Sequence, residues 1–196
     1  MKLHYAVRII RYGILGLLIL TGGFSCRTYE THAVRTQEWP GVSPETMRDA
    51  GVGFFESTGN ARGANSQKNL YDALAFALRE QGYITRESDF IQKVLKNNDL
   101  PDDRLLTEAE ITRMTREFGG RLYLQGRIEE TRTIDVVEER VQIMVNVWIY
   151  DARRGEKIGE IKLFGTDLEY NTGRESLDMS RLIVADLERL ILEREE

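Results

Sequence analysis

The chain has 196 residues, 30% of them charged and 41% hydrophobic, which is the composition of one globular domain with additional segments. Without the basic Lys2, Arg8 and Arg11 near the amino terminus, the remainder holds 24 basic and 32 acidic residues, a net charge of −8. Phosphate binding needs a local excess of Lys and Arg, so we expect no nucleic-acid partner.

Cys26 is the only cysteine, so an intrachain disulfide is excluded. The two histidines, His4 and His32, lie outside the domain that the pattern below predicts. We therefore expect no metal, no cofactor and no His-based catalytic arrangement.

Residues 1–25 have the parts of a bacterial export signal, with a basic start, a short apolar run and small residues before Cys26. The uncharged stretch 12–26 is shorter than the ~20 residues that a spanning helix needs. Cys26 stands where the signal ends, as in a lipoprotein signal, so we predict lipid attachment at Cys26. An ordinary signal peptide with an incidental cysteine is the alternative. Arg27 follows the cysteine, where an Asp would suggest retention in the inner membrane, so we expect the periplasmic face of the outer membrane.

Residues 26–46 are polar and contain breakers such as Trp39-Pro40-Gly41, so we predict a flexible tether there. A single α/β domain is expected over residues 47–196. Its first half begins with a buried strand at 52–55, a Gly-containing loop and a helix that ends at Gly82. A short strand at 83–85, a small helix from Ser88 and a second helix opened by the Thr107–Glu110 capping box follow.

Three strands and a final helix complete the predicted domain. The first strand covers 121–130, and the second has a β-branched stripe at 141–149 that alternates with polar and aromatic residues. A turn at 151–155 leads to a partner strand at 157–164, and residues 174–193 form the last helix. The order β-α-β-α-α-β-β-β-α predicts a mixed sheet of about four to five strands, with helices mainly on one face.

Three segments of this pattern resemble the CsgG/LpoB-type periplasmic lipoproteins. They are Val52–Phe55 with the loop and the Leu70, Leu74, Leu78 helix, the stretch Phe118–Gly126 (FGGRLYLQG), and the hairpin Tyr150–Ile158 (YDARRGEKI). The resemblance covers roughly residues 48–193 and implies an anticodon-binding-domain-like α/β fold. It implies a role in binding or assembly, and it transfers no catalytic residue. Members of that group include an activator of a peptidoglycan synthase, a curli secretion channel subunit, and envelope or flagellar accessory lipoproteins.

Nucleotide and hydrolase chemistry have little support. Gly51-Val52-Gly53 begins like a dinucleotide fingerprint, but Glu56 stands at the third glycine position. A glycosidase needs two carboxylates that face one cleft. Adjacent carboxylates that could supply such a pair are Glu129-Glu130, Glu138-Glu139 and Asp102-Asp103. Neighbours on a strand point to opposite faces, so the first pair should not act together. We expect no enzyme activity and keep a hydrolase as an alternative.

The face opposite the aliphatic stripe is the candidate binding surface. We predict that Tyr123, Met144, Trp148 and Tyr150 share it, because they alternate with the apolar core residues. Ile161 and Leu163 are expected to extend it, with Arg127 and Lys162 at the rim. A partner-binding patch is one interpretation, since Trp, Tyr and Met are enriched in interface cores. Burial beneath a helix or the tether is the other.

The sequence thus predicts a lipid-anchored periplasmic module that binds an unidentified envelope protein, held to the membrane by its lipid and with possible homo-oligomers. Regulation of a peptidoglycan synthase, or a surface-appendage or flagellar accessory role, is the most concrete version. A subunit of a CsgG-like secretion pore is the alternative.

Overall fold

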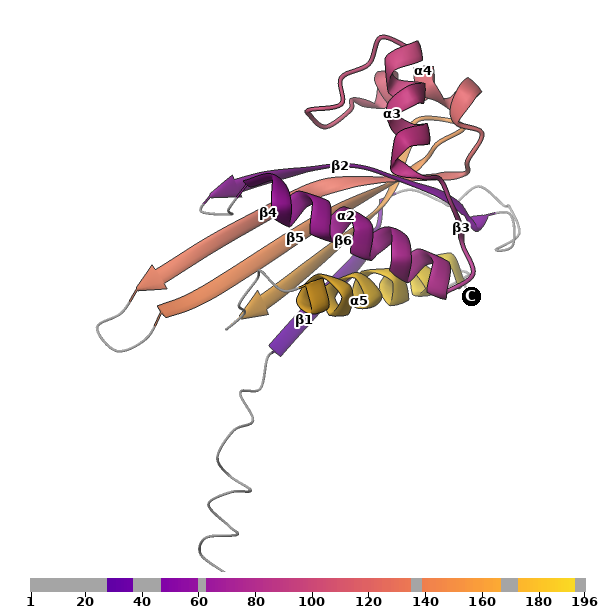
Figure 1. Ribbon diagram of the computed structural model, residues 1–196. Coiled ribbons are helices and arrows are strands. Elements are labelled where there is room, and N and C mark those ends of the chain that lie inside the picture. Colours follow the sequence, from indigo (N-terminus) through magenta and orange to yellow (C-terminus); the bar gives the residue numbers. More distant parts are fainter. Residues whose placement is uncertain (1–27, 37–46, 60–62, 135–138, 167–172, 193–196) are drawn as a thin grey trace, which may run out of the picture.

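The computed structural model describes residues 28–36, 47–59, 63–134, 139–166 and 173–192. Within these ranges, four helices pack against one six-stranded sheet (Figure 1). The strands are β1 (Thr28–Arg35), β2 (Asp49–Gly59), β3 (Ile84–Thr85), β4 (Leu122–Ile134), β5 (Glu139–Asp151) and β6 (Glu156–Thr166). The helices are α2 (Gly63–Glu80), α3 (Ser88–Asn97), α4 (Glu108–Phe118) and α5 (Gly173–Leu192). The predicted α/β class is confirmed, with slightly more strands than expected.

The strand order across the sheet is β1-β6-β5-β4-β2-β3. The pairs β1–β6, β6–β5 and β5–β4 are antiparallel, whereas β2 is parallel to both β4 and β3. The sheet is therefore mixed, as predicted. Helices lie between the parallel strands β2, β3 and β4, a short turn joins the antiparallel β5 and β6, and β1 pairs with β6 although the two are far apart in the chain.

The first strand corrects part of the predicted tether. Residues 28–35, assigned to a flexible segment above, pair with β6 along their whole length, from Thr28 opposite Thr166 to Arg35 opposite Gly159. Arg35 donates a hydrogen bond from Nε to the carbonyl of Leu190 on α5 (3.0 Å), which ties the strand to the helical layer. The polar composition of this segment reflects an edge strand, which needs little apolar surface of its own.

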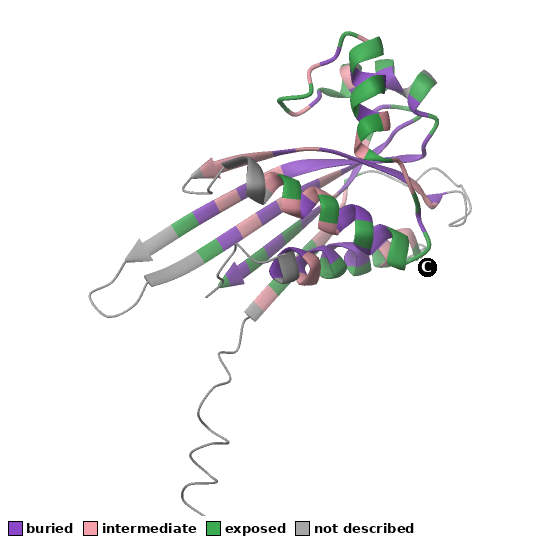
Figure 2. Cartoon of the chain, viewed as in Figure 1, coloured by how far each residue is buried: buried purple, intermediate pink, exposed green. Residues whose placement is uncertain are grey.

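The main core lies between the sheet and the two long helices, α2 and α5, which lie side by side across one face (Figure 1). The predicted stripe on β5 is confirmed, because Ile143, Val145, Val147 and Ile149 are at most 1% exposed. Burial alternates along β5 and β6, as the banded strands in Figure 2 show. Ile161 and Leu163 point into this core, so the expectation that they extend the opposite face is wrong.

A second, smaller core lies at one end of the opposite face. There α3, α4 and the loop between them (residues 88–118, called the knob below) cover the sheet next to the β5–β6 turn (Figure 1). Two glycines on β2 make room for the rings beneath the knob. A Cβ at Gly51 would lie 2.5 Å from the Phe118 ring, and one at Gly53 would lie 2.0 Å from the Tyr123 hydroxyl. These glycines serve close packing of the strand against the two rings.

Candidate functional site

The candidate site is the part of the sheet that the knob leaves uncovered, called the open face below. Strand register brings side chains from five strands onto it. They are Glu30, His32 and Val34 from β1, Glu160, Lys162 and Phe164 from β6, Gln142, Met144, Asn146 and Trp148 from β5, Arg127 and Glu129 from β4, and Glu56 and Thr58 from β2.

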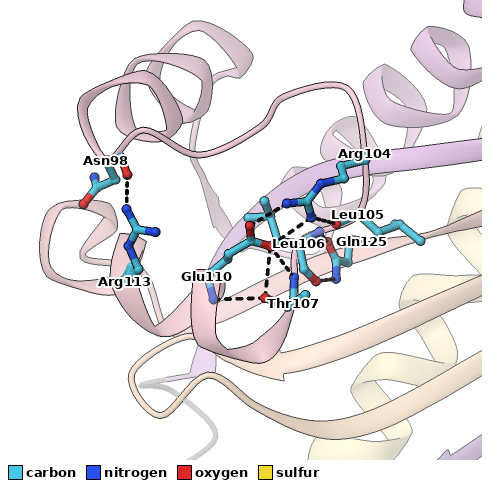
Figure 3. A network of polar contacts seen from close by, with 8 residues as sticks. All are labelled: Asn98, Arg104, Leu105, Leu106, Thr107, Glu110, Arg113 and Gln125. Carbon is cyan, nitrogen blue, oxygen red and sulfur yellow. Dashed lines mark hydrogen bonds and ion pairs between the residues drawn. The ribbon is translucent and has the colours of Figure 1, made fainter.

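The knob is fastened at the edge of this face by one glutamine (Figure 3). The Gln125 side chain accepts a hydrogen bond from the Leu106 N–H (2.8 Å) and donates one to the Leu106 carbonyl (2.7 Å). Gln125 is 1% exposed and Leu106 is 4% exposed, so water cannot hydrogen-bond to their polar groups. The two bonds therefore satisfy groups that would otherwise be buried without a partner. The amide of Gln125 thus satisfies both backbone polar groups of Leu106, its N–H and its carbonyl.

Helix α4 begins with the capping box predicted from sequence. The Thr107 N–H donates to the Glu110 carboxylate (2.9 Å), and the Glu110 N–H lies 3.4 Å from the Thr107 hydroxyl. Arg104 makes a forked pair with the same carboxylate, with nitrogen–oxygen distances of 2.9 and 2.6 Å. The hydrogen bonds from Arg104 and from Thr107 lower the pKa of Glu110 to about 2.

The structure divides the predicted four-residue patch. Tyr123 is fully buried and Tyr150 is 7% exposed, both within the small core beneath the knob. Burial raises the pKa of both hydroxyls, so they remain protonated. A solvent-facing role for these two tyrosines is therefore wrong, because a helix covers them. Met144 and Trp148 are half-buried and remain on the open face.

Trp148 lies at the boundary between the knob and the open face. It packs against the small core on one side. On the other side the Lys157 ammonium lies 6.0 Å from the centre of its ring, within the range of a cation–π contact. Lys157 and Lys162 both approach the Glu160 carboxylate, at 2.6 and 3.3 Å. Partial burial alone would raise the pKa of Glu160, but the two lysines outweigh burial and hold it below its usual range.

An apolar pair with acidic ends crosses the middle of the open face. In the register, Glu30 lies opposite Phe164, Phe164 opposite Met144, and Met144 opposite Glu129. Phe164 is 37% exposed, and its ring meets His32 edge to face, with 6.1 Å between centroids. Among the described residues, neither Glu30 nor Glu129 has an ion-pair partner. We call Glu30, Phe164, Met144 and Glu129 the central row.

A second row lies beside the central row and is mainly basic. It contains His32, Lys162, Asn146 and Arg127 in register, and ends at Glu56 on β2. Arg127 pairs with Glu56 at 2.8 Å, so its charge is compensated within the row. Among the residues that the structure describes, the charged groups of the two rows without an ion-pair partner are therefore the two glutamates of the central row. This surface therefore favours a ligand that presents an apolar side chain flanked by cationic groups.

Several residues of this surface were not predicted from the sequence pattern. Glu30 and His32 were missed because β1 was assigned to the tether. Phe164 was missed although a signal existed, since Glu160, Lys162 and Phe164 alternate with Ile161 and Leu163 along one strand.

The other predicted site residues give no cluster. Cys26 lies outside the described residues, as does Glu138. Glu129 and Glu130 point to opposite faces, and Asp102 and Asp103 are exposed in the knob loop. Within the described ranges, no three His, Cys, Asp or Glu side chains are placed to hold a metal ion. None of the helices that the structure describes has the length and apolarity needed to span a bilayer.

No protein-family model and no curated protein matches this sequence. Solved structures do match. The PelC dodecamer from Paraburkholderia phytofirmans has a TM-score of 0.51 at 12% identity, over 82% of this chain and 98% of that chain. Lipoprotein GNA1162 from Neisseria meningitidis has a TM-score of 0.50 at 15% identity, over 74% of this chain and 99% of that one. The LpoB C-terminal domain from Escherichia coli has a TM-score of 0.48 at 16% identity, over 67% and 88%.

The likeness to PelC and GNA1162 shows a shared fold, because identities of 12% and 15% carry nothing finer. The predicted fold is thus one that a solved lipoprotein also has. The finer assignment to the CsgG/LpoB-type group stays a prediction.

Proposed function

We propose that this protein is a lipid-anchored periplasmic lipoprotein of the outer membrane. In this proposal it binds a protein of a cell-envelope complex through its open face and does not act as an enzyme. The observation that carries the binding role is the central row, in which two exposed or half-buried apolar side chains lie between two carboxylates that have no ion-pair partner in the described part of the chain. The export signal, the position of Cys26 and the fold shared with a solved lipoprotein support the anchoring.

The proposed occupant is a protein segment that presents an apolar side chain next to Lys or Arg. Phe164 and Met144 would contact the apolar group, while Glu30 and Glu129 would face the cations. Charge complementarity of this kind acts mainly on the rate and specificity of association. The specific roles of peptidoglycan-synthase regulator or of appendage or flagellar accessory protein belong to this proposal as its most concrete forms.

Photo-crosslinking tests the binding surface with a matched pair of phenylalanines. Phe164 on the open face is 37% exposed, and Phe76 on the outer side of α2 is 45% exposed. A photoreactive phenylalanine analogue is placed at either position in the full chain and irradiated in the native envelope. We expect a discrete protein adduct from position 164 and none from position 76. The same adduct from both positions, or none from 164, contradicts the proposal.

A charge reversal then tests the chemistry of the partner. Glu129→Lys should reduce the yield of the adduct from position 164, because it repels the proposed cationic segment. Glu87→Lys, at an exposed position just before α3, is the control and should leave the yield unchanged. Equal yields of the adduct in both variants would contradict the inference that Glu129 faces a cationic group of the partner.

A ring-forming subunit, such as that of a secretion pore, is the second candidate. The fold likeness to a protein solved as a dodecamer favours it. Mass photometry of the detergent-extracted protein separates the two candidates. A monomer or dimer rejects the ring, and a particle many times the chain's 22.6 kDa supports it.

A further inference from the structure

The distance between the proposed lipid and the folded domain is set by two residues. Cys26 precedes Thr28, the first residue of β1. Even a fully extended chain spans only ~3.3–3.6 Å per residue, so the two Cα atoms lie at most about 7 Å apart. A lipid on Cys26 would therefore be joined to an edge strand almost directly, and not through the flexible tether that the sequence pattern of residues 26–46 predicts.

Strand β1 is bound firmly enough to fix that position. All eight of its residues are in register with β6, and Tyr29 and Ala33 pack against the main core. Beyond the strand, the Thr36 N–H donates to the Ile158 carbonyl (3.2 Å), and its hydroxyl donates to the Lys157 carbonyl (2.8 Å). The strand is thus held along its length and at its far end.

The start of β1 lies near one end of the sheet. Thr28 lies opposite Thr166, Thr166 opposite Gln142, and Gln142 opposite Thr131. These four residues are polar and uncharged, and the last three are exposed. Beyond this line β4 and β5 continue to Ile134 and Glu139, so the same end of the sheet also holds the charged residues Arg132, Arg140 and Glu139.

The knob lies at the other end of the sheet (Figure 1). Tyr123, beneath the knob, is eight residues along β4 from Thr131. At ~3.3 Å per residue, this separates the knob from the Thr166–Gln142–Thr131 end by about 26 Å. The central row is two residues from that end, which places Phe164 and Met144 roughly 7 Å further along their strands.

We propose that the domain rests directly on the membrane surface, with the Thr166–Gln142–Thr131 end toward the lipid headgroups and the knob pointing away from them. The inference rests on the lipid anchor of the proposed function and deepens that proposal. The near end of the central row, Glu30, then lies within about 15 Å of the anchored residue. A partner that binds it must itself lie at the same membrane surface, so the basic and apolar segment belongs to the membrane-adjacent part of another protein.

Fluorescence quenching in vesicles tests this orientation. A thioether to lipid would consume the thiol of Cys26, so an introduced cysteine would be the only free thiol in the lipidated chain. Thr166→Cys at the near end and Lys93→Cys on α3 of the knob are both exposed positions. Each full-length variant is purified from membranes, labelled, and reconstituted into phosphatidylethanolamine and phosphatidylglycerol vesicles that contain a lipid with a nitroxide headgroup.

We expect the label at position 166 to be quenched several times more strongly than the label at position 93. A 12-residue Gly-Ser insertion between Arg27 and Thr28 serves as the matched control. It adds a flexible reach of about 18 Å and should abolish most of this difference. Equal quenching at both positions without the insertion, or an unchanged difference with it, overturns the orientation.

Mass spectrometry of the same samples distinguishes a failure of the proposed orientation from a failure of the proposed lipid anchor. Equal quenching in a chain that carries the acyl mass on Cys26 refutes the orientation and leaves the anchored lipoprotein intact. A chain without acyl mass on Cys26 refutes the anchor and, with it, the orientation. Circular dichroism spectra that match those of the unmodified chain establish that each variant is folded.

Discussion

The Gln125 amide offers a direct test of how the knob is held to the sheet. Gln125→Met keeps the length and approximate volume of the side chain but removes both hydrogen bonds to Leu106. The Leu106 N–H and carbonyl then stay buried without a partner, because Leu106 is only 4% exposed. A buried unsatisfied group costs roughly 1–3 kcal/mol, so the two together should destabilise the protein by about 2–5 kcal/mol.

Urea unfolding followed by circular dichroism measures the loss, with Gln142→Met as the control. Gln142 is an exposed glutamine on β5, and its replacement should change the unfolding free energy by less than about 0.5 kcal/mol. Hydrogen exchange of the Leu106 amide gives a local reading and should become faster in Gln125→Met. If that variant stays within about 0.5 kcal/mol of wild type and the Leu106 amide stays protected, the knob is not fastened by this residue.

Three further predictions concern the same end of the molecule. Gly53→Ala should lower the melting temperature and cost about 3 kcal/mol or more, because its Cβ would lie 2.0 Å from the hydroxyl of the fully buried Tyr123; a melting curve like that of wild type would refute this. Arg121→Met should cost about 3–5 kcal/mol by removing the 3.0 Å ion pair of the fully buried Asp151, which then keeps Arg154 at 3.9 Å, and adding Asp151→Asn should recover part of the loss. In urea unfolding, a loss in the double variant equal to the sum of the two single losses would show that the two are uncoupled. For Glu110, the pKa in the folded chain is about 2, below its ordinary 4.5, so its stabilising contribution is full above pH 4.5 and is lost as the pH falls toward 2. The stability difference between wild type and Glu110→Gln should shrink over that range, and a carboxyl that titrates in NMR near 4.5 would contradict the Arg104 and Thr107 contacts.

Local features of the chain were predictable because they depend on neighbours in sequence. The β-branched stripe on β5 specified a half-buried strand, since alternating side chains point to opposite faces. The Thr107–Glu110 pair marked the start of α4, and Gly155, with a φ of 72°, closes the predicted turn at 151–155. These elements need no knowledge of what they pack against.

The candidate site was predictable only in part. The alternation on β4 and β5 correctly placed Tyr123 and Trp148 on the face opposite the main core. Whether that face meets solvent depends on where α3 and α4 dock, and this contact joins segments far apart in the chain. The aromatic residues beneath the knob and those beside it have the same local pattern, so only the packing distinguishes them.

The sequence by itself determined the alternation of strands and helices and the apolar stripes of the main core. The tertiary structure decided that residues 28–35 form an edge strand. Their own pattern is polar, and only the paired backbone of β6 makes an extended conformation favourable there. It also decided that Glu30, Phe164, Met144 and Glu129 form one row, because four strands distant in sequence must be in register before their side chains meet.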